Sequence, residues 1–90
     1  MNSSLDKLRK EIDEIDDQLL GLLAGRLDIV RKIGLYKKQN GLKTFDEKRW
    51  RDVLESKLSK GDSLGLSREF IKKLYSIIHE FSLKEENDSR

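Results

Sequence analysis

The sequence predicts an all-α fold: one very long N-terminal helix and two shorter ones, paired with a second copy into an intertwined helical-bundle dimer. Three observations predict it. The 90 residues contain no proline, which favours uninterrupted helices and disfavours a many-turned β fold. Apolar residues recur at steps of three and four along the first 33 positions. The first helix predicted from this pattern is also too long for a compact single chain of this size.

The first helix is predicted over residues 4–39. Asn40 and Gly41 form its stop signal, since glycine readily takes the left-handed conformation that ends helices. Such a helix is about 54 Å long, whereas a compact chain of this size has a radius of gyration of about 12 Å. It cannot bury its apolar seam against the rest of its own chain, so dimerisation is expected. The seam consists of Leu5, Leu8, Ile12, Ile15, Leu19, Leu22, Ile29 and Ile33, with Arg26 in the middle.

The second helix is predicted over residues 45–60. Thr44 and Glu47 fit a capping box, in which a threonine hydroxyl and a carboxylate satisfy amides at the helix start. Gly61 is expected to end this helix.

The third helix is predicted over residues 67–85, with Ser67 as its N-cap. Residues 86–90 are expected to form a frayed tail, with Glu86 at the limit of order. Together the three helices are expected to form one domain over residues 1–90.

Composition restricts the function classes. There is no cysteine and only one histidine, His79, so thiolate and histidine-rich metal sites are not expected. The 19 basic and 17 acidic residues are interleaved, whereas a nucleic-acid binder more often concentrates its basic residues. No apolar run has transmembrane length and the N-terminus is charged, so we expect neither nucleic acid nor membrane as a partner, and a cytoplasmic location.

Five polar residues fall on or beside apolar faces. Arg26 and Lys37 are eleven positions apart, which returns to within about 20° of the same helix face at a separation of about 16 Å. Arg49 lies at the start of the second helix, and Ser82 and Glu86 replace apolar residues at the end of the third. Three cations on the inner side of a helical bundle call for a common anion, and a small dicarboxylate suits arginine.

Each of these residues has a structural interpretation as well. Arg26 can pair with an acidic residue of a partner helix and fix the register of the two. Lys37 and Arg49 can be solvated surface charges, and Ser82 a small core residue. The sequence leaves these alternatives open.

Arg9 adds a fourth cation at a distance. It lies about 42 Å from Lys37 along one straight helix, so the two cannot contact one small ligand within a single chain. In an antiparallel dimer the Arg9 end of one helix reaches the Lys37 half of the other.

Over nearly its whole length the chain resembles the all-helical class of chorismate mutases. The resembling segments are LRKEIDEIDDQLLGLLAGR, IGLYK, the Asp-x-x-Arg run from Asp46 to Arg49, and the third helix with Ser82. The resemblance implies an intertwined homodimer that converts chorismate to prephenate without a cofactor or metal, the first step toward phenylalanine and tyrosine.

The resemblance also implies residue roles. Lys37, Glu86 and Arg26 are the implied catalytic residues, with Lys37 and Glu86 facing the ether oxygen that takes up negative charge. Arg9 of the other subunit and Arg26 would bind carboxylates, assisted by Arg49. The full implied substrate-binding set is Arg9, Arg26, Lys37, Asp46 through its backbone amide, Arg49, Ser82 and Glu86, with Trp50 as a further candidate.

These residue types fit the chemistry. A Claisen rearrangement is intramolecular and needs no nucleophile, base or metal. The protein must hold chorismate in its compact conformer and stabilise negative charge on the ether oxygen as the C–O bond breaks.

Two positions depart from the family pattern. Trp50 stands where many members carry a glutamate that binds the substrate hydroxyl, and an indole cannot accept that hydrogen bond. At Glu86 a carboxyl can donate to the ether oxygen only when protonated, so we expect activity to fall as pH rises.

Two other functions remain open from the sequence. Isochorismate pyruvate-lyase activity on the same scaffold would use the same carboxylate-binding cations. A non-catalytic helical module for dimerisation or docking would explain Trp50, although it gives no reason for inward-facing cations.

Overall fold

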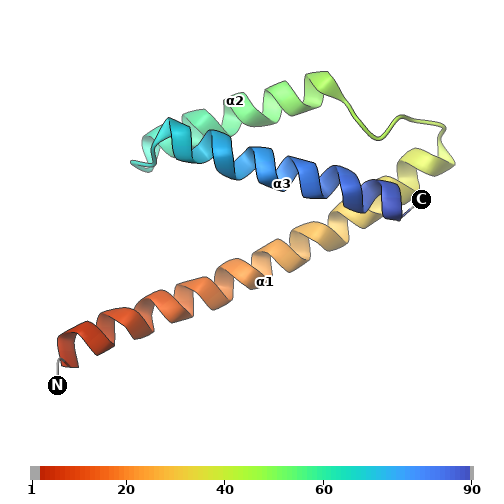
Figure 1. Cartoon of the computed structure of the whole chain (residues 1–90). Coiled ribbons are helices and arrows are strands. Elements are labelled where there is room, and N and C mark those ends of the chain that lie inside the picture. The colour runs from red at the N-terminus through yellow and green to blue at the C-terminus, as the bar shows by residue number, and fades with distance from the viewer. Residues whose placement is uncertain (1–2, 90) are drawn as a thin grey trace.

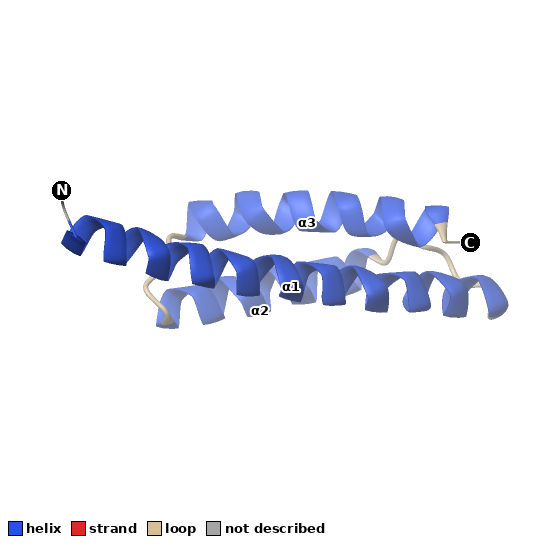
Figure 2. Cartoon of the chain, turned by 90° about the horizontal axis from the view of Figure 1, so that it is seen from below, coloured by secondary structure: helices blue, strands red, loops and turns tan. Residues whose placement is uncertain are grey.

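The computed structural model describes residues 3–89 as three helices joined by two short connections. They are α1 (Ser3–Gln39), α2 (Glu47–Ser63) and α3 (Arg68–Asp88). Figure 1 shows α2 and α3 as an antiparallel hairpin that meets α1 only along the C-terminal part of α1. The three helices follow roughly one long axis in Figure 2. The predicted all-α fold of one long and two shorter helices is confirmed.

Both helix C-termini next to the loops close with the same motif. After α1, Gly41 takes φ 64° and Leu42 N donates to Lys37 O at 2.8 Å. After α2, Gly65 takes φ 74° and Leu66 N donates to Gly61 O at 2.9 Å. These are Schellman motifs, in which a left-handed glycine turns the chain back over the last carbonyls.

The predicted end of the second helix at Gly61 is wrong. The helix continues to Ser63, and Gly65 provides the stop. Gly61 is instead buried inside α2, where an added Cβ would lie 2.8 Å from Ile71 Cγ1. Its lack of a side chain serves helix packing.

The predicted capping box is also wrong, because Asp46 is the N-cap of α2 and its carboxylate accepts from Arg49 N at 3.0 Å. Thr44 lies two residues earlier and is buried, and its hydroxyl donates to Asn87 Oδ1 at 2.8 Å. Thr44 therefore ties the connection between α1 and α2 to the end of α3.

The predicted tail also needs correction. α3 continues to Asp88 with Ser89 as its C-cap, and Glu86 is buried. Contacts with α1 keep this end helical. Arg90, like Met1 and Asn2, lies outside the described residues.

Ser67 is the N-cap of α3, accepting from Phe70 N at 3.0 Å.

α1 and α3 cross closely at Gly34. A Cβ at that position would lie 2.7 Å from the backbone oxygen of Glu86. On either side of the crossing, Arg31 forms an ion pair with Glu85 at 2.5 Å and Lys37 one with Glu86 at 2.8 Å. The crossing brings the charged end of α3 against the last turns of α1.

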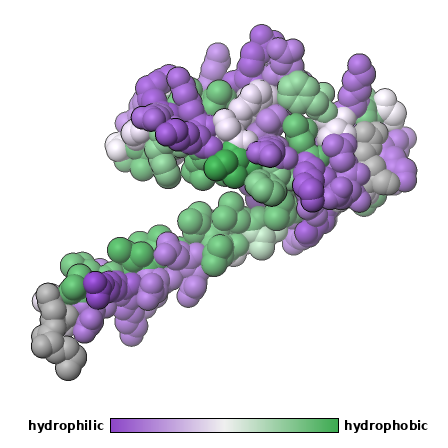
Figure 3. Space-filling model, viewed as in Figure 1, coloured by the Kyte–Doolittle hydropathy of each residue, from purple (hydrophilic) through white to green (hydrophobic). Residues whose placement is uncertain are grey.

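The apolar core of a single chain is small. The buried apolar side chains are Val30, Leu58 and Ile71, and the radius of gyration is 16.8 Å, against about 12 Å for a compact chain of this length. Figure 3 shows an apolar strip along the free part of α1, on the side toward the hairpin. Its exposed residues include Leu5, Leu8, Ile12, Ile15, Leu19 and Leu22.

Candidate active site

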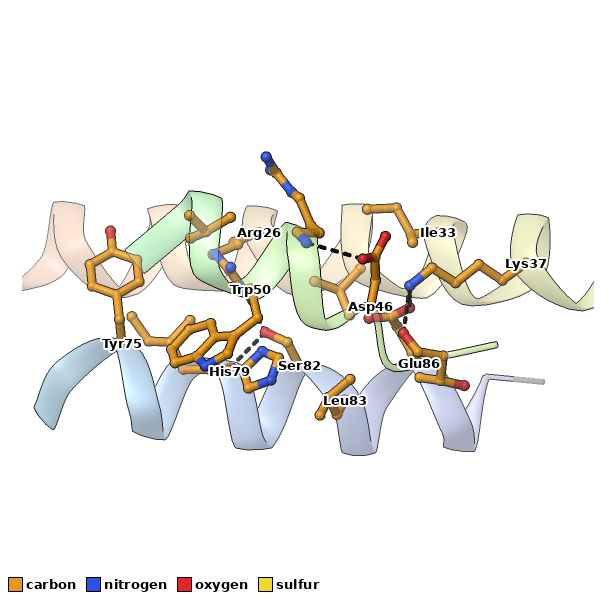
Figure 4. A pocket seen from close by; sticks show the side chains of 15 residues that line it. Arg26, Ile33, Lys37, Asp46, Trp50, Tyr75, His79, Ser82, Leu83 and Glu86 are labelled. Carbon is orange, nitrogen blue, oxygen red and sulfur yellow. Dashed lines mark hydrogen bonds and ion pairs between the residues drawn. The ribbon is translucent and has the colours of Figure 1, made fainter. Parts of the chain in front are cut away.

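A cavity of about 320 Å³ opens between the C-terminal half of α1, the start of α2 and the second half of α3. Figure 4 shows side chains of all three helices pointing into it. Seven of the eight residues singled out in the sequence line this cavity: Arg26, Lys37, Asp46, Arg49, Trp50, Ser82 and Glu86.

Arg26 is held by a neutral partner. Its Nη1 donates to Ser82 Oγ at 2.6 Å, and the Ser82 hydroxyl donates its own proton to Ile78 O at 2.7 Å. Ser82 is buried, so its oxygen is a fixed acceptor. Within the described chain no carboxylate forms an ion pair with Arg26, and its positive charge is left for a ligand.

Lys37 has two protein partners. Its Nζ donates to Thr44 O at 2.6 Å and lies 2.8 Å from Glu86 Oε1. Both charged side chains are largely buried, with 19% and 10% of their surfaces exposed. An ammonium has three protons, and the hydrogen bond to Thr44 O uses one of them.

The negative charge of the buried Glu86 carboxylate is compensated mainly by the positive charge of Lys37. Its Oε1 is buried and, among the described residues, has no hydrogen-bond partner of good geometry. The 2.8 Å approach of Lys37 Nζ is therefore an ion pair rather than a well-directed hydrogen bond. This oxygen retains capacity for a further contact.

Asp46 and Arg49 lie at the mouth of the cavity. The Asp46 carboxylate is used in capping α2, so its backbone amide is the group compatible with the predicted ligand contact. The Arg49 side chain is exposed and forms no ion pair with any described residue. Arg49 lies in the first turn of α2 and contributes to the lining of the cavity.

Trp50 forms an aromatic stack with His79. The two rings are 4.0 Å apart at 14°, and Phe45 packs against His79 at 5.7 Å and 57°. Burial lowers the pKa of His79 below its usual value, and the positive charge of Arg26 lowers it further while Glu86 raises it.

Sequence reasoning missed His79 as a residue of this site. The available signal was its spacing, because His79 lies four residues after Tyr75, three before Ser82 and seven before Glu86 on one helix face. Its stacking partner on another helix could not be identified from that spacing.

Arg9 is the one predicted site residue outside the cavity. It lies on the exposed N-terminal part of α1, which diverges from the hairpin in Figure 1. Within one chain it does not approach the other cations.

Two further findings concern residues 3–89 as a whole. No group of three or more histidine, cysteine, aspartate or glutamate side chains among residues 3–89 is arranged to hold a metal ion. In the same range, no helix combines the length and apolar character needed to cross a membrane.

Comparison with known proteins gives consistent results. The T-protein of Enterobacter agglomerans is 33% identical over 98% of this chain and 24% of its own length. The T-protein of Haemophilus influenzae is 30% identical over 90% of this chain and 24% of its length. A bifunctional chorismate mutase/prephenate dehydratase of Buchnera aphidicola is 34% identical over 91% of this chain and 21% of its own length. The chain thus spans about a quarter of the length of these curated relatives.

A solved structure of similar size also matches. It is a conserved hypothetical protein from Pyrococcus furiosus, 36% identical, with a TM-score of 0.69 over 96% of this chain and 99% of that one. The family model for chorismate mutase type II matches residues 8–87. This range contains Arg9 and every residue that lines the cavity. This chain therefore belongs to the chorismate mutase type II family.

Proposed function

We propose that this chain is a chorismate mutase, an isomerase that converts chorismate to prephenate in phenylalanine and tyrosine biosynthesis. The observation that carries the proposal is the charge of the cavity. Arg26, Lys37 and Arg49 line it, and Glu86 is the one carboxylate paired with any of them among the described residues. The excess positive charge suits a small dianion, and chorismate has two carboxylates.

Arg26 and Arg49 are the proposed carboxylate ligands. Arginine donates in a planar fork that matches a carboxylate. Ser82 holds one nitrogen of Arg26, which reduces the conformational freedom lost when the substrate binds. Ser82 therefore supports a substrate carboxylate through Arg26, and the backbone amide of Asp46 is proposed to contact the polar edge of the ring.

Lys37 is the proposed donor to the ether oxygen. As the C–O bond breaks, negative charge grows on that oxygen, and a preorganised charged donor in a partly dry cavity stabilises it. Thr44 accepts one proton of Nζ, and the ion pair with Glu86 also holds Nζ in place. A further proton of Nζ is proposed to meet the ether oxygen.

Glu86 is the proposed second group at the ether oxygen. Protonated, it donates a hydrogen bond there; ionised, it opposes the growing charge and also neutralises Lys37. The ion pair at 2.8 Å is the arrangement expected of the ionised form.

A homodimer that completes each site is part of the proposal. Besides the exposed apolar strip on α1, a second strip lies on α3. Its exposed residues, at steps of four and three, are Phe70, Leu74, Ile77 and Phe81. An antiparallel partner would cover these strips and bring its Arg9 to the cavity as a further carboxylate ligand.

Residues 1–90 are proposed to form one mutase domain that works in the cytoplasm with no cofactor. Among the described residues Arg26 and Arg49 have no carboxylate counter-ion, which argues against a purely structural docking module. The lyase alternative uses the same cations, and it is best separated by experiment.

The test is to incubate the purified chain separately with chorismate and with isochorismate and to identify the products. Mutase activity gives prephenate from chorismate, with loss of chorismate absorbance. Release of pyruvate from isochorismate without prephenate formation would assign the chain to the lyase. A folded dimer that converts neither substrate would support the docking module.

A further inference from the structure

His79 lies in the cavity but has no part in the proposed chemistry. It faces the space between α1, α2 and α3 beside Ser82, and Figure 4 shows its ring against Trp50. Its ring nitrogens form no hydrogen bond with any residue of the described range, and its recorded contacts are with Trp50 and Phe45. A hydrogen-bonding group without a polar partner in a ligand cavity is a candidate for ligand recognition.

Stacking fixes the position of His79. The indole of Trp50 covers one face of the imidazole at 4.0 Å and 14°, and Phe45 packs against it at an angle. The stack joins α2 to α3, and a ring held on its face still exposes its edge, where both nitrogens lie. Trp50 thus acts as a support that orients the imidazole.

The charge of His79 differs from that of the other polar groups in the cavity. Arg26 on α1 and Glu86 on α3 are the charged groups that influence it, and burial is the largest cause of its lowered pKa. At neutral pH the ring is therefore uncharged, with one nitrogen that donates and one that accepts. Such a group suits a neutral hydroxyl better than a carboxylate.

Chorismate carries such a hydroxyl. Its two carboxylates match the arginines and its ether oxygen matches Lys37, which leaves the ring hydroxyl to be bound. The other hydroxyls near the cations are engaged, since Ser82 donates to Ile78 and Thr44 donates to Asn87. Trp50 has an indole N–H that can only donate.

We propose that His79, oriented by its stack on Trp50, hydrogen-bonds the ring hydroxyl of the substrate and makes that hydroxyl a specificity determinant of this site. This inference rests on the proposed mutase function. His79 then determines which cyclohexadiene dicarboxylates bind, while Arg26 and Lys37 determine that the bound one reacts.

The test crosses two enzyme variants with two substrates. His79→Phe keeps an aromatic ring to stack on Trp50 but has no hydrogen-bonding atom, whereas His79→Gln keeps a donor and an acceptor without the ring. Each is assayed with chorismate and with an analogue whose ring hydroxyl is replaced by hydrogen. We expect His79→Phe to lower kcat/KM for chorismate about threefold to tenfold, mainly through KM. For the analogue we expect no change, and His79→Gln should recover part of the loss with chorismate.

Tyr75→Phe is the matched control, because Tyr75 also lines the cavity and its hydroxyl, unlike those of Ser82 and Thr44, donates to no described residue. Melting temperatures of all variants measure any structural role. Equal losses on both substrates in His79→Phe would overturn the inference, as would a hydroxyl-dependent loss in Tyr75→Phe instead. If the wild-type chain does not convert chorismate at all, the proposed function itself fails, which is a separate outcome.

Discussion

At the scale of single residues, the candidate site holds two guanidinium groups, Arg26 and Arg49, that no described carboxylate neutralises. Arg26 is bonded to a serine rather than to a carboxylate. An arginine in an apolar seam is costly unless it is paired. Here it is exposed at an open cavity, so its charge is not buried without a partner.

The bond between Ser82 and Arg26 gives a first prediction. Ser82→Ala removes the acceptor that orients the guanidinium, and hydrogen bonds to charged groups contribute about 1.5–3 kcal/mol. We expect kcat/KM for chorismate to fall about tenfold or more in steady-state assays. Ser76→Ala, an exposed position on the same helix, is the control and should match the wild type. An unchanged rate in Ser82→Ala would show that Arg26 needs no such support.

Glu86 gives a prediction about charge at the ether oxygen. Its carboxylate forms an ion pair with Lys37 and, when ionised, opposes negative charge on that oxygen. Glu86→Gln places a neutral donor there, so kcat/KM for chorismate should exceed the wild type by about tenfold in steady-state assays at neutral pH. An unchanged rate in Glu86→Gln would reject a role for this carboxylate.

At the scale of helices, glycines determine where α1 and α3 meet and where helices end. Gly34 allows the backbone of α3 to approach α1, and this approach brings Glu86 to Lys37. Gly41 and Gly65 end α1 and α2 through the same hydrogen-bond pattern. The geometry of the site therefore follows from positions that carry no side chain.

Gly34→Ala tests this role. The added Cβ would lie 2.7 Å from a backbone oxygen, so α3 must shift. We expect the free energy of unfolding to fall by about 1–3 kcal/mol in urea titrations, together with a loss of activity. Gly21→Ala is the matched control, because its Cβ meets nothing within 4 Å in the chain, and it should stabilise the helix by up to about 1 kcal/mol. Equal effects of the two substitutions would contradict a specific role for Gly34.

Much at this scale was predictable from the sequence. The three-and-four apolar spacing predicted the long helix, and the eleven-residue spacing brought Arg26 and Lys37 to one face. Local signals were ambiguous where two residues competed. Thr44 and Asp46 are both good N-caps, and packing against Asn87 decided between them. Gly61 and Gly65 both resemble a helix stop signal. Gly61 lies inside the helix instead, where its close contact with Ile71 leaves no room for a side chain. The His79 stack depends on tertiary geometry, which no local spacing encodes.

At the scale of the whole molecule, one chain exposes too much apolar surface for its small core. Its extents are 59 × 25 × 15 Å, and the apolar strip of α1 faces open space. Burying a large aliphatic side chain contributes about 1.5–3 kcal/mol. In the proposed homodimer, a second copy covering these residues would therefore contribute to the driving force for a stable fold.

The dimer is tested by a charge in this strip. Ile15→Asp should prevent association and lower helix content, because a buried carboxylate without a partner is strongly unfavourable. Sedimentation should give the wild type about twice the chain mass of 10.5 kDa. Asp17→Asn, on the opposite face of α1, is the control and should remain dimeric. A wild-type mass of one chain at assay concentrations would contradict the dimer.

The most direct test of the account is to combine two inactive chains. In the proposed dimer each site takes Lys37 from one chain and Arg9 from the other. Arg9→Ala and Lys37→Ala should each convert very little chorismate to prephenate alone. Refolded together in equal amounts, they should recover about a quarter of wild-type activity, because half of the dimers are mixed and each has one intact site. Recovery at that level supports a chorismate mutase site built from two chains. A mixture that stays as inactive as its parents would contradict it.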